Sequence, residues 1–197
     1  HLIISKCSNE LDLINDLNFL LIKNGFTNKE LKLYFKKYAI STRYDSKYVR
    51  YFKYVLQNMI DLKKKNKIIK LLFKKYVKLE ESEISKSFYL SVKDLKQILN
   101  SNMYVGGHGY DHFWMNKKTV NDQKKDINKT LSFLELIGAK TNRWIMSYPY
   151  GSYNDNTIKI LKGKKCLAGL TIKIGLNNLA KDNLFELKRY DTNDFPK

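Results

Sequence analysis

Glycine and proline, the two residues that most often interrupt helices and strands, are distributed very unevenly along this chain of 197 residues. Residues 1–100 contain one glycine, Gly25, and no proline, whereas eight of the nine glycines and both prolines lie beyond residue 103. Helices can therefore run through the first half with few interruptions, while the second half must turn often. This contrast predicts two differently built parts, a helical half over 1–100 and a second part that begins near residue 103.

The first half carries the apolar periodicity and the start signals of helices. Thr27 and Glu30 in "TNKE" form a capping box, and Ser91 and Asp94 in "SVKD" resemble one. We expect helices over the residue ranges 8–23, 27–38, 46–60, 61–78 and 91–100.

The second half alternates short apolar runs with helical patterns. The expected strands are 103–105, 143–148 and 166–172, and the expected helices are 119–137 and 155–162. This alternation is typical of a parallel sheet or a β/α barrel, in which the chemistry gathers at the carboxyl ends of the strands. His108 and Tyr150 follow the first two expected strands, so both stand where such sites form.

The composition, 43% apolar and 13% aromatic, is typical of a globular protein. No apolar run approaches the roughly eighteen residues of a transmembrane helix, so none is expected. Cys7 and Cys166 are too few for a disulfide framework or a cysteine-based zinc site, and we interpret them as buried, reduced thiols. These features, with no visible signal peptide, lean toward the cytoplasm, but the first residue is His1 rather than Met, so the location stays open. The oligomeric state stays open as well.

The net charge of +18 raises the question of a nucleic-acid partner. The densest lysine run, "DLKKKNKIIKLLFKKYVK" at 61–78, also carries apolar residues at helical spacing, which is typical of an amphipathic helix with a solvated basic face. The excess charge is spread over both halves of the chain. We therefore expect no nucleic-acid partner, and a basic nucleic-acid-binding protein is the less favoured alternative.

Two of the three histidines, His108 and His112, stand four residues apart in "GGHGYDH". On an extended strand they would lie about 13 Å apart, too far to share an ion, whereas on a helical turn they come within about 6 Å. The glycines around His108 permit the necessary bend, which makes the pair candidate metal ligands. A structural pair packed against Tyr110 and Trp114 is the alternative. Gly109 stands where the helical zinc-protease motif requires Glu, which argues against a metalloprotease.

"GGHGYDH", together with "SYPYGSYN" at 147–154, resembles two successive motifs of the polysaccharide deacetylases, carbohydrate esterase family 4. In that family each motif follows a barrel strand. The resemblance covers about residues 89–197 and implies an α/β fold, an incomplete, distorted β/α barrel, with 1–88 as a large helical insertion. It also implies a hydrolase of non-peptide carbon–nitrogen bonds that removes acetyl groups from N- or O-acetylated sugars or polysaccharide, with a divalent metal, expected to be zinc.

The resemblance also implies roles for individual residues. His108 and His112 would bind the metal, and the backbone N–H of Tyr150 would stabilise the oxyanion of the tetrahedral intermediate. Pro149 would fix the direction of that N–H, and Gly151 would let the substrate approach. An ordinary turn after a strand is the alternative interpretation of "YPYG".

The tail "LKRYDTNDFP" at 187–196 offers two further candidates. Arg189 and Asp191 would bind sugar hydroxyls or orient catalytic groups at the end of another strand. A surface ion pair followed by a turn is the alternative.

The chain also departs from the family pattern. The family's Asp-Asp motif supplies the catalytic base and the third metal ligand, and no Asp-Asp pair occurs in this sequence. With the start at His1, we expect a carboxyl-terminal fragment with little or no activity; a catalytically inactive carbohydrate-binding barrel is the alternative. Ser147 stands where some members have Arg, and no histidine follows His112 to serve as the usual general acid.

Overall fold

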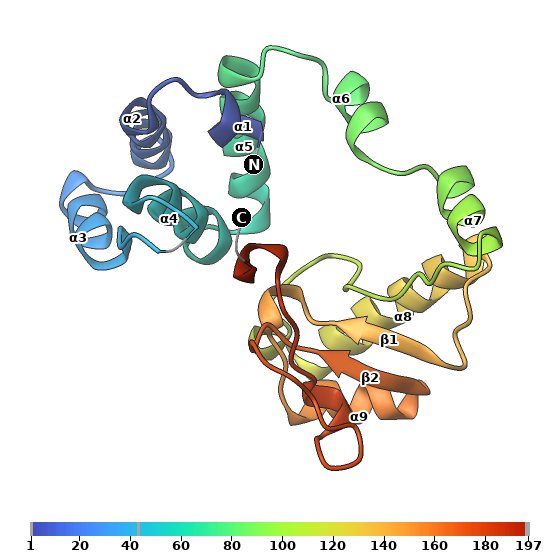
Figure 1. The fold of residues 1–197 in the computed structure, drawn as a ribbon. Coiled ribbons are helices and arrows are strands. Elements are labelled where there is room, and N and C mark those ends of the chain that lie inside the picture. Colours follow the sequence, from blue (N-terminus) through green and yellow to red (C-terminus); the bar gives the residue numbers. More distant parts are fainter. Residues whose placement is uncertain (1, 43, 196–197) are drawn as a thin grey trace. The chain divides into compact units, whose positions relative to one another are not determined.

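The computed structural model describes residues 2–42 and 44–195, which form two compact units that divide between Phe88 and Tyr89 (Figure 1). Among its described residues, the first unit contains helices and no strand. The second unit combines helices with a short parallel sheet. Each unit buries its own cluster of apolar side chains.

The described helices of the first unit are α1 (Leu2–Lys6), α2 (Glu10–Ile22), α3 (Asn28–Tyr38), α4 (Lys47–Tyr54), the π-helix η1 (Val55–Met59), α5 (Leu62–Tyr76) and α6 (Glu81–Phe88). The unit is built around α2, whose Leu17 and Leu21 are fully buried beside Tyr51 of α4 and Ile68 of α5.

The expected helix starts are confirmed where the sequence carries a cap. Thr27 accepts a hydrogen bond of 3.2 Å from the Glu30 N–H, and Ser91 accepts one of 3.2 Å from the Asp94 N–H, both in complete capping boxes. The single helix expected over 46–60 is wrong in part, because the chain changes from α to π hydrogen bonding after Tyr54. The short helices α1 and α6 have no such start signal and were not expected.

The second unit contains a two-stranded parallel sheet of β1 (Trp144–Ser147) and β2 (Cys166–Leu170). Its described helices are α7 (Val92–Asn100), the 3₁₀ turn η2 (Met115–Lys117), α8 (Val120–Ile137), the 3₁₀ turn η3 (Pro149–Gly151), α9 (Asp155–Gly163), and the 3₁₀ turns η4 (Leu184–Glu186) and η5 (Thr192–Asp194). The parallel pair with α9 between its strands is the βαβ unit that the alternating pattern predicts.

Single-residue bridges extend the sheet on both sides. Gly107 pairs in parallel with Met146 of β1, and Leu187 pairs in parallel with Leu170 of β2. Four chain segments therefore run in the same direction, and their carboxyl ends meet at one edge. His108, Pro149 and Arg189 each follow one of these segments within two residues.

The strand expected at 103–105 is wrong. Gly107 makes the two hydrogen bonds of a parallel bridge, to the Ile145 carbonyl at 2.9 Å and from the Ser147 N–H at 2.8 Å. The N–H of Ile145, two residues before Ser147 in β1, donates to the hydroxyl of Tyr104 at 2.7 Å. The hydroxyl of a side chain thus accepts the hydrogen bond that a carbonyl of a neighbouring strand would have accepted.

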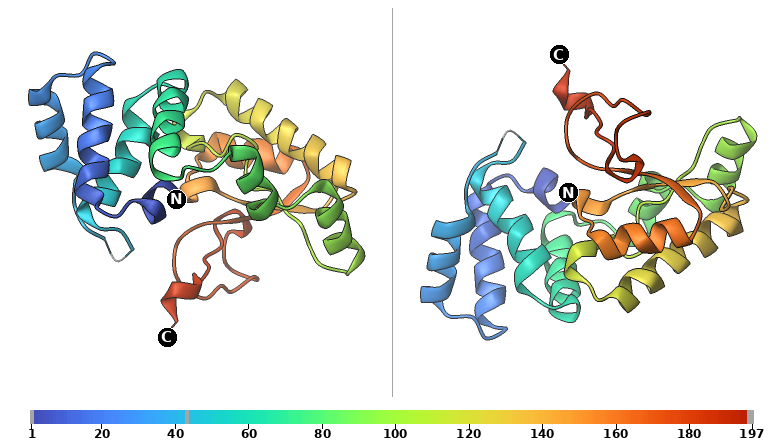
Figure 2. Two further views of the ribbon diagram at one scale, coloured as in Figure 1. Left: turned by 90° about the horizontal axis from the view of Figure 1, so that it is seen from above. Right: turned by 90° about the horizontal axis from the view of Figure 1, so that it is seen from below.

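Helices α8 and α9 lie side by side on one face of the sheet (Figure 2). Their buried residues Ile127 and Leu161 belong to one cluster with Trp144, Met146 and Cys166 of the strands. Burial raises the pKa of the Cys166 thiol to about 11, so it stays protonated at neutral pH. This packing fixes the sheet edge that carries the candidate residues.

The expected β/α barrel is not confirmed, since the described residues hold two strands and two bridges rather than a closed sheet. Within its described residues, the tail expected as a strand forms a single bridge, at Leu187, and then the 3₁₀ turn η5. In the described part of the chain, no helix combines the length and the apolar character needed to cross a bilayer.

Candidate active site

His108 is held by the neighbouring strand. Its Nδ1 lies 2.7 Å from the backbone carbonyl oxygen of Ser147, the last residue of β1. Because a carbonyl oxygen only accepts, Nδ1 carries the hydrogen and Nε2 presents its lone pair. A metal-binding histidine usually has an acceptor of this kind behind it.

The second histidine faces the first. The Nε2 atoms of His112 and His108 lie 3.1 Å apart, with His112 donating to the lone pair of His108. Two nitrogens bound to one tetrahedral zinc ion at about 2.0–2.1 Å would lie about 3.4 Å apart. The pair therefore fits two neighbouring ligand positions of one ion, which would replace the shared hydrogen.

The backbone brings the histidines together by a route that differs from the expected helical turn. Residues 108–114 form an irregular loop in which Gly109 has φ +72° and His112 has φ +48°. A left-handed conformation costs a residue other than glycine about 1–2 kcal/mol. Such strain persists where surrounding contacts enforce it, often at functional sites.

Asp126 of α8 supplies part of that enforcement. The residue is 1% exposed, and its two carboxylate oxygens accept hydrogen bonds from the backbone N–H groups of Tyr110 at 3.0 Å and Asp111 at 2.7 Å. The sequence analysis missed this residue. The available signal was a carboxylate on the buried stripe of an amphipathic helix, a place where charged residues are rarely found without partners.

Gly109 brings the two glycine-rich loops into contact. A Cβ atom at this position would lie 3.0 Å from Cγ of Pro149 and 3.2 Å from Oδ2 of Asp126. The close approach therefore requires a residue without a side chain, in addition to the positive φ.

Tyr150 lies beside the histidine pair. Its ring meets the His112 ring edge-on, with centroids 4.8 Å apart, and stacks on Trp114 at 4.7 Å with an interplanar angle of 4°. Burial raises the pKa of its hydroxyl. The residue has φ +58°, and within the described part of the chain its backbone N–H has no protein acceptor, which leaves it available to a ligand.

Trp114 was not among the expected site residues, although it appeared in the aromatic sequence around the histidines. Its indole Nε1 is buried and has no hydrogen-bond acceptor among the described residues. The ring thus acts as a packed support under Tyr150.

The space in front of Gly151 is filled by the protein itself. A Cβ atom there would lie 2.5 Å from Cγ1 of Ile172, and the residue has φ +66°. Packing against Ile172 therefore explains the glycine. Pro149, the residue that begins this turn, is buried.

The tail places one of its two candidates near the histidines. Arg189 donates from Nη1 to Oγ of Ser147 at 3.3 Å, and Ser147 is the residue whose carbonyl holds His108. Asp191 begins a turn, in which its N–H donates to Oδ2 of Asp194 at 2.8 Å. Arg189 is therefore connected to the histidine pair through Ser147, because its guanidinium binds the Ser147 side chain and the Ser147 carbonyl binds His108.

No group of three or more His, Cys, Asp or Glu side chains that could hold a metal ion occurs among the residues described. Asp111, the carboxylate between the two histidines in sequence, pairs with Lys129 at 3.0 Å, and this contact raises the pKa of the lysine. A metal site that used the two histidines would therefore need at least one further ligand.

A cavity of about 320 Å³ opens beside His108. Its lining is mainly apolar and includes Val105, Gly107, Thr130 and Phe133. Of the two histidines, His108 lines this partly apolar hollow.

The polysaccharide deacetylase family model matches residues 36–166, more than half of the chain, and the match includes both glycine-rich loops. This chain belongs to the polysaccharide deacetylase family. The resemblance inferred from the sequence is thereby confirmed. The match begins within α3, so it also covers part of the helical unit.

Solved structures similar to this chain include a deacetylase of Streptococcus pyogenes, PplD, in complex with acetate (TM-score 0.49, 21% identity, 62% of this chain and 57% of that chain). Another is the BpsB deacetylase domain of Bordetella bronchiseptica (TM-score 0.45, 14% identity, 52% and 48%). A third is a CE4 family pseudoenzyme from Bacillus anthracis (TM-score 0.36, 25% identity, 38% and 26%). The chain thus spans less than two thirds of the length of each of these three proteins. A search of curated protein sequences gives no significant match.

None of these three TM-scores reaches 0.5, so the family assignment depends on the family model. Polysaccharide deacetylases are hydrolases of carbohydrate substrates and in general depend on a metal.

Proposed function

We propose that this chain is part of a metal-dependent deacetylase that removes acetyl groups from N- or O-acetylated sugars or polysaccharide, with zinc as the metal. The observation that carries the proposal is the 3.1 Å separation of the His108 and His112 Nε2 atoms, together with the Ser147 carbonyl behind His108. Both histidines would bind as neutral imidazoles. A zinc ion held there supplies a bound water of pKa about 7 and polarises the acetyl carbonyl.

Tyr150 would stabilise the reaction intermediate through its backbone. Attack on an acetyl group places negative charge on the carbonyl oxygen, and a fixed N–H aimed at that oxygen stabilises it. The N–H of Tyr150, which follows β1 and has no acceptor among the residues that the structure describes, supports this role. Pro149 at the start of the turn and Gly151 against Ile172 would hold that N–H in place.

Arg189 and Asp191 would complete the sugar-binding edge. Some family members have Arg at the position of Ser147, and here the guanidinium of Arg189 reaches Ser147 from the tail. We propose that Arg189 supplies the positive charge which those members place on β1. Asp191 would accept hydrogen bonds from sugar hydroxyls.

In this interpretation residues 89–197 are the carboxyl-terminal part of an incomplete β/α barrel, and residues 1–88 are a helical insertion or cap. The four parallel segments around β1 and β2 support it. The missing acidic pair would supply the base and the third ligand.

These 197 residues alone are therefore expected to hydrolyse acetylated sugars slowly or not at all, because no Asp-Asp pair occurs in the sequence. The test is acetate release from N-acetylated sugar oligomers with added zinc, which should stay at background. A rate near that of an intact family member would contradict the assignment of the base to the Asp-Asp motif.

A catalytically inactive carbohydrate-binding barrel is the second candidate, favoured by the lack of a third ligand in the described part of the chain. Sugar binding that is unchanged by a chelator and by the His108→Ala, His112→Ala double variant would support it. Sugar binding that requires zinc would support the deacetylase.

A further inference from the structure

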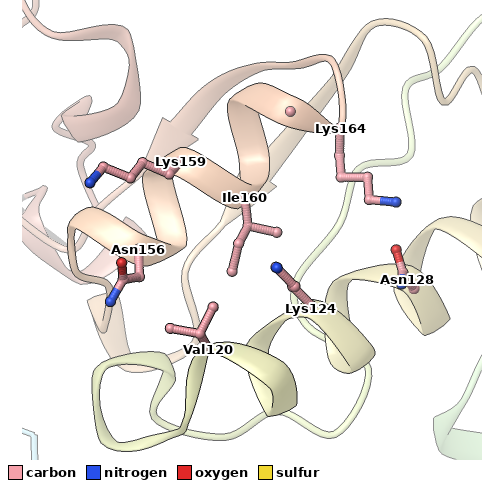
Figure 3. Close-up of a pocket in the computed structure, with 8 residues that line it drawn as sticks. Val120, Lys124, Asn128, Asn156, Lys159, Ile160 and Lys164 are labelled. Atoms are coloured by element: carbon pink, nitrogen blue, oxygen red, sulfur yellow. The ribbon is translucent and has the colours of Figure 1, made fainter.

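Helices α8 and α9 enclose a groove of about 560 Å³ that shares no residue with the candidate active site (Figure 3). Its lining comes from the two helices and the residue after α9: Val120, Lys124, Asn128, Asn156, Lys159, Ile160, Gly163 and Lys164. The active-site residues instead follow the carboxyl ends of the parallel segments.

Three lysines dominate the electrostatics of this groove, and no carboxylate lines it. Across residues 2–42 and 44–195, the ammonium groups of Lys124, Lys159 and Lys164 have no ion pair or hydrogen-bond partner. Two other lysines, Lys53 and Lys129, are paired with Asp45 and Asp111. The groove therefore concentrates unneutralised positive charge, which attracts anions.

Polar and apolar side chains are both distributed along the groove. Figure 3 shows Lys159 and Asn156 on one side, Asn128 and Lys164 on the other, and Lys124 near Val120 and Ile160 between them. A matching ligand carries several negative charges along its length, together with less polar units.

We infer that this groove binds a phosphodiester-linked chain of sugars or polyols. Lysine ammonium groups bind phosphate as point charges, and the asparagine amides can both donate to and accept from hydroxyl groups. The aliphatic side chains of Val120 and Ile160 pack against the carbon units between two phosphates. The inference does not depend on the proposed deacetylation, because the groove is separate from the histidine pair.

Single-stranded nucleic acid also carries regularly spaced phosphates. Proteins that bind it usually stack its bases on aromatic side chains, and no aromatic residue lines this groove. A chain without bases therefore suits the lining better.

The test uses fluorescently labelled poly(glycerol phosphate) as the probe and measures its binding to the intact chain by anisotropy. The variant Lys124→Gln, Lys159→Gln, Lys164→Gln should weaken binding at least tenfold. The control Lys93→Gln, Lys140→Gln, Lys181→Gln removes the same charge from exposed positions outside the groove and should change the affinity about twofold or less.

A second variant, Asn128→Asp with Asn156→Asp, keeps the lysines and the side-chain sizes but places two carboxylates in the groove. It should also lower the affinity for the probe at least tenfold. Because the number of lysines is unchanged, that loss would show that the probe binds in this groove rather than to the positive charge of the chain in general. Equal weakening by the groove and control lysine variants, no binding by the unaltered chain, or tighter binding of single-stranded DNA would overturn the inference.

Discussion

The carboxylate of Asp126 accepts a hydrogen bond of 2.7 Å from the backbone N–H of Asp111, a residue between the two facing histidines. Its other oxygen accepts the N–H of Tyr110 at 3.0 Å. A buried charge from α8 therefore fixes the loop that places His112 opposite His108. The geometry of the candidate metal ligands therefore depends on a residue that binds the loop backbone between them.

Replacing Asp126 should destabilise the second unit. Asp126→Ala leaves two loop N–H groups without their acceptors, and we expect a loss of about 2–3 kcal/mol in the free energy of unfolding. Urea unfolding followed by tryptophan fluorescence measures this unit alone, because both tryptophans, Trp114 and Trp144, lie in it.

The matched control is Asp155→Ala, an exposed carboxylate in the first turn of α9. It should lose about 0.5 kcal/mol, the contribution of a charge near a helix N-terminus. If Asp126→Ala cost no more than this control, Asp126 would not hold the loop.

Alanine substitutions at two glycines with similar backbone conformations distinguish the cost of steric crowding from the cost of a left-handed backbone. Gly109 and Gly138 have φ +72° and φ +85°, but a Cβ at Gly138 would have no atom within 4 Å. Gly138→Ala should cost about 1 kcal/mol of unfolding free energy for the left-handed backbone. Gly109→Ala should cost about 1–2 kcal/mol more, because the methyl group meets Pro149 and Asp126.

Thermal unfolding of the two alanine variants under the same conditions provides the comparison. Equal losses would mean that the contact between the two loops is not tight.

The hydrogen bond from the Tyr153 hydroxyl to Oε1 of Glu186, 2.6 Å long, should make stability depend on pH. It lowers the pKa of Glu186 in the folded state, so its stabilising effect is present above the unfolded pKa of about 4.3 and is lost as the pH falls. Burial and then this hydrogen bond raise the pKa of Tyr153 to about 12, so stability should also fall as the pH rises from about 10 to 12.

The free energy of unfolding, measured from pH 3 to 7, should therefore drop less steeply on acidification in Tyr153→Phe than in the unaltered chain. Glu186→Gln should flatten the same part of the curve. Parallel curves for all three proteins would show that the pair contributes nothing to the acid response.

Much of the helical architecture could be predicted because its signals are local. The capping boxes at Thr27 and Ser91 fix helix starts from four consecutive residues. The two glycine-rich loops also could be located, since Gly109 and Gly151 both have the positive φ angles that glycine permits.

The other features of the fold and the site depend on contacts between residues far apart in the sequence, which local patterns do not show. The strand predicted at 103–105 does not form, because the side-chain hydroxyl of Tyr104 accepts the hydrogen bond of the Ile145 N–H. Asp126 could not be connected with the histidine loop because their hydrogen bonds span 15 and 16 residues and exist only once α8 is packed. The helical turn expected for the histidines was replaced by a loop, because His112 adopts a left-handed conformation.

The central claim, that His108 and His112 are two ligands of one metal ion, is tested by zinc titration calorimetry. His1→Ala is the control, because it removes the third histidine of the chain and leaves the pair intact. The unaltered chain and this control should each bind one zinc ion weakly and release it to a chelator, since the pair supplies only two ligands. The His108→Ala, His112→Ala double variant should bind none at that site, and equal zinc uptake by all three proteins would contradict the claim.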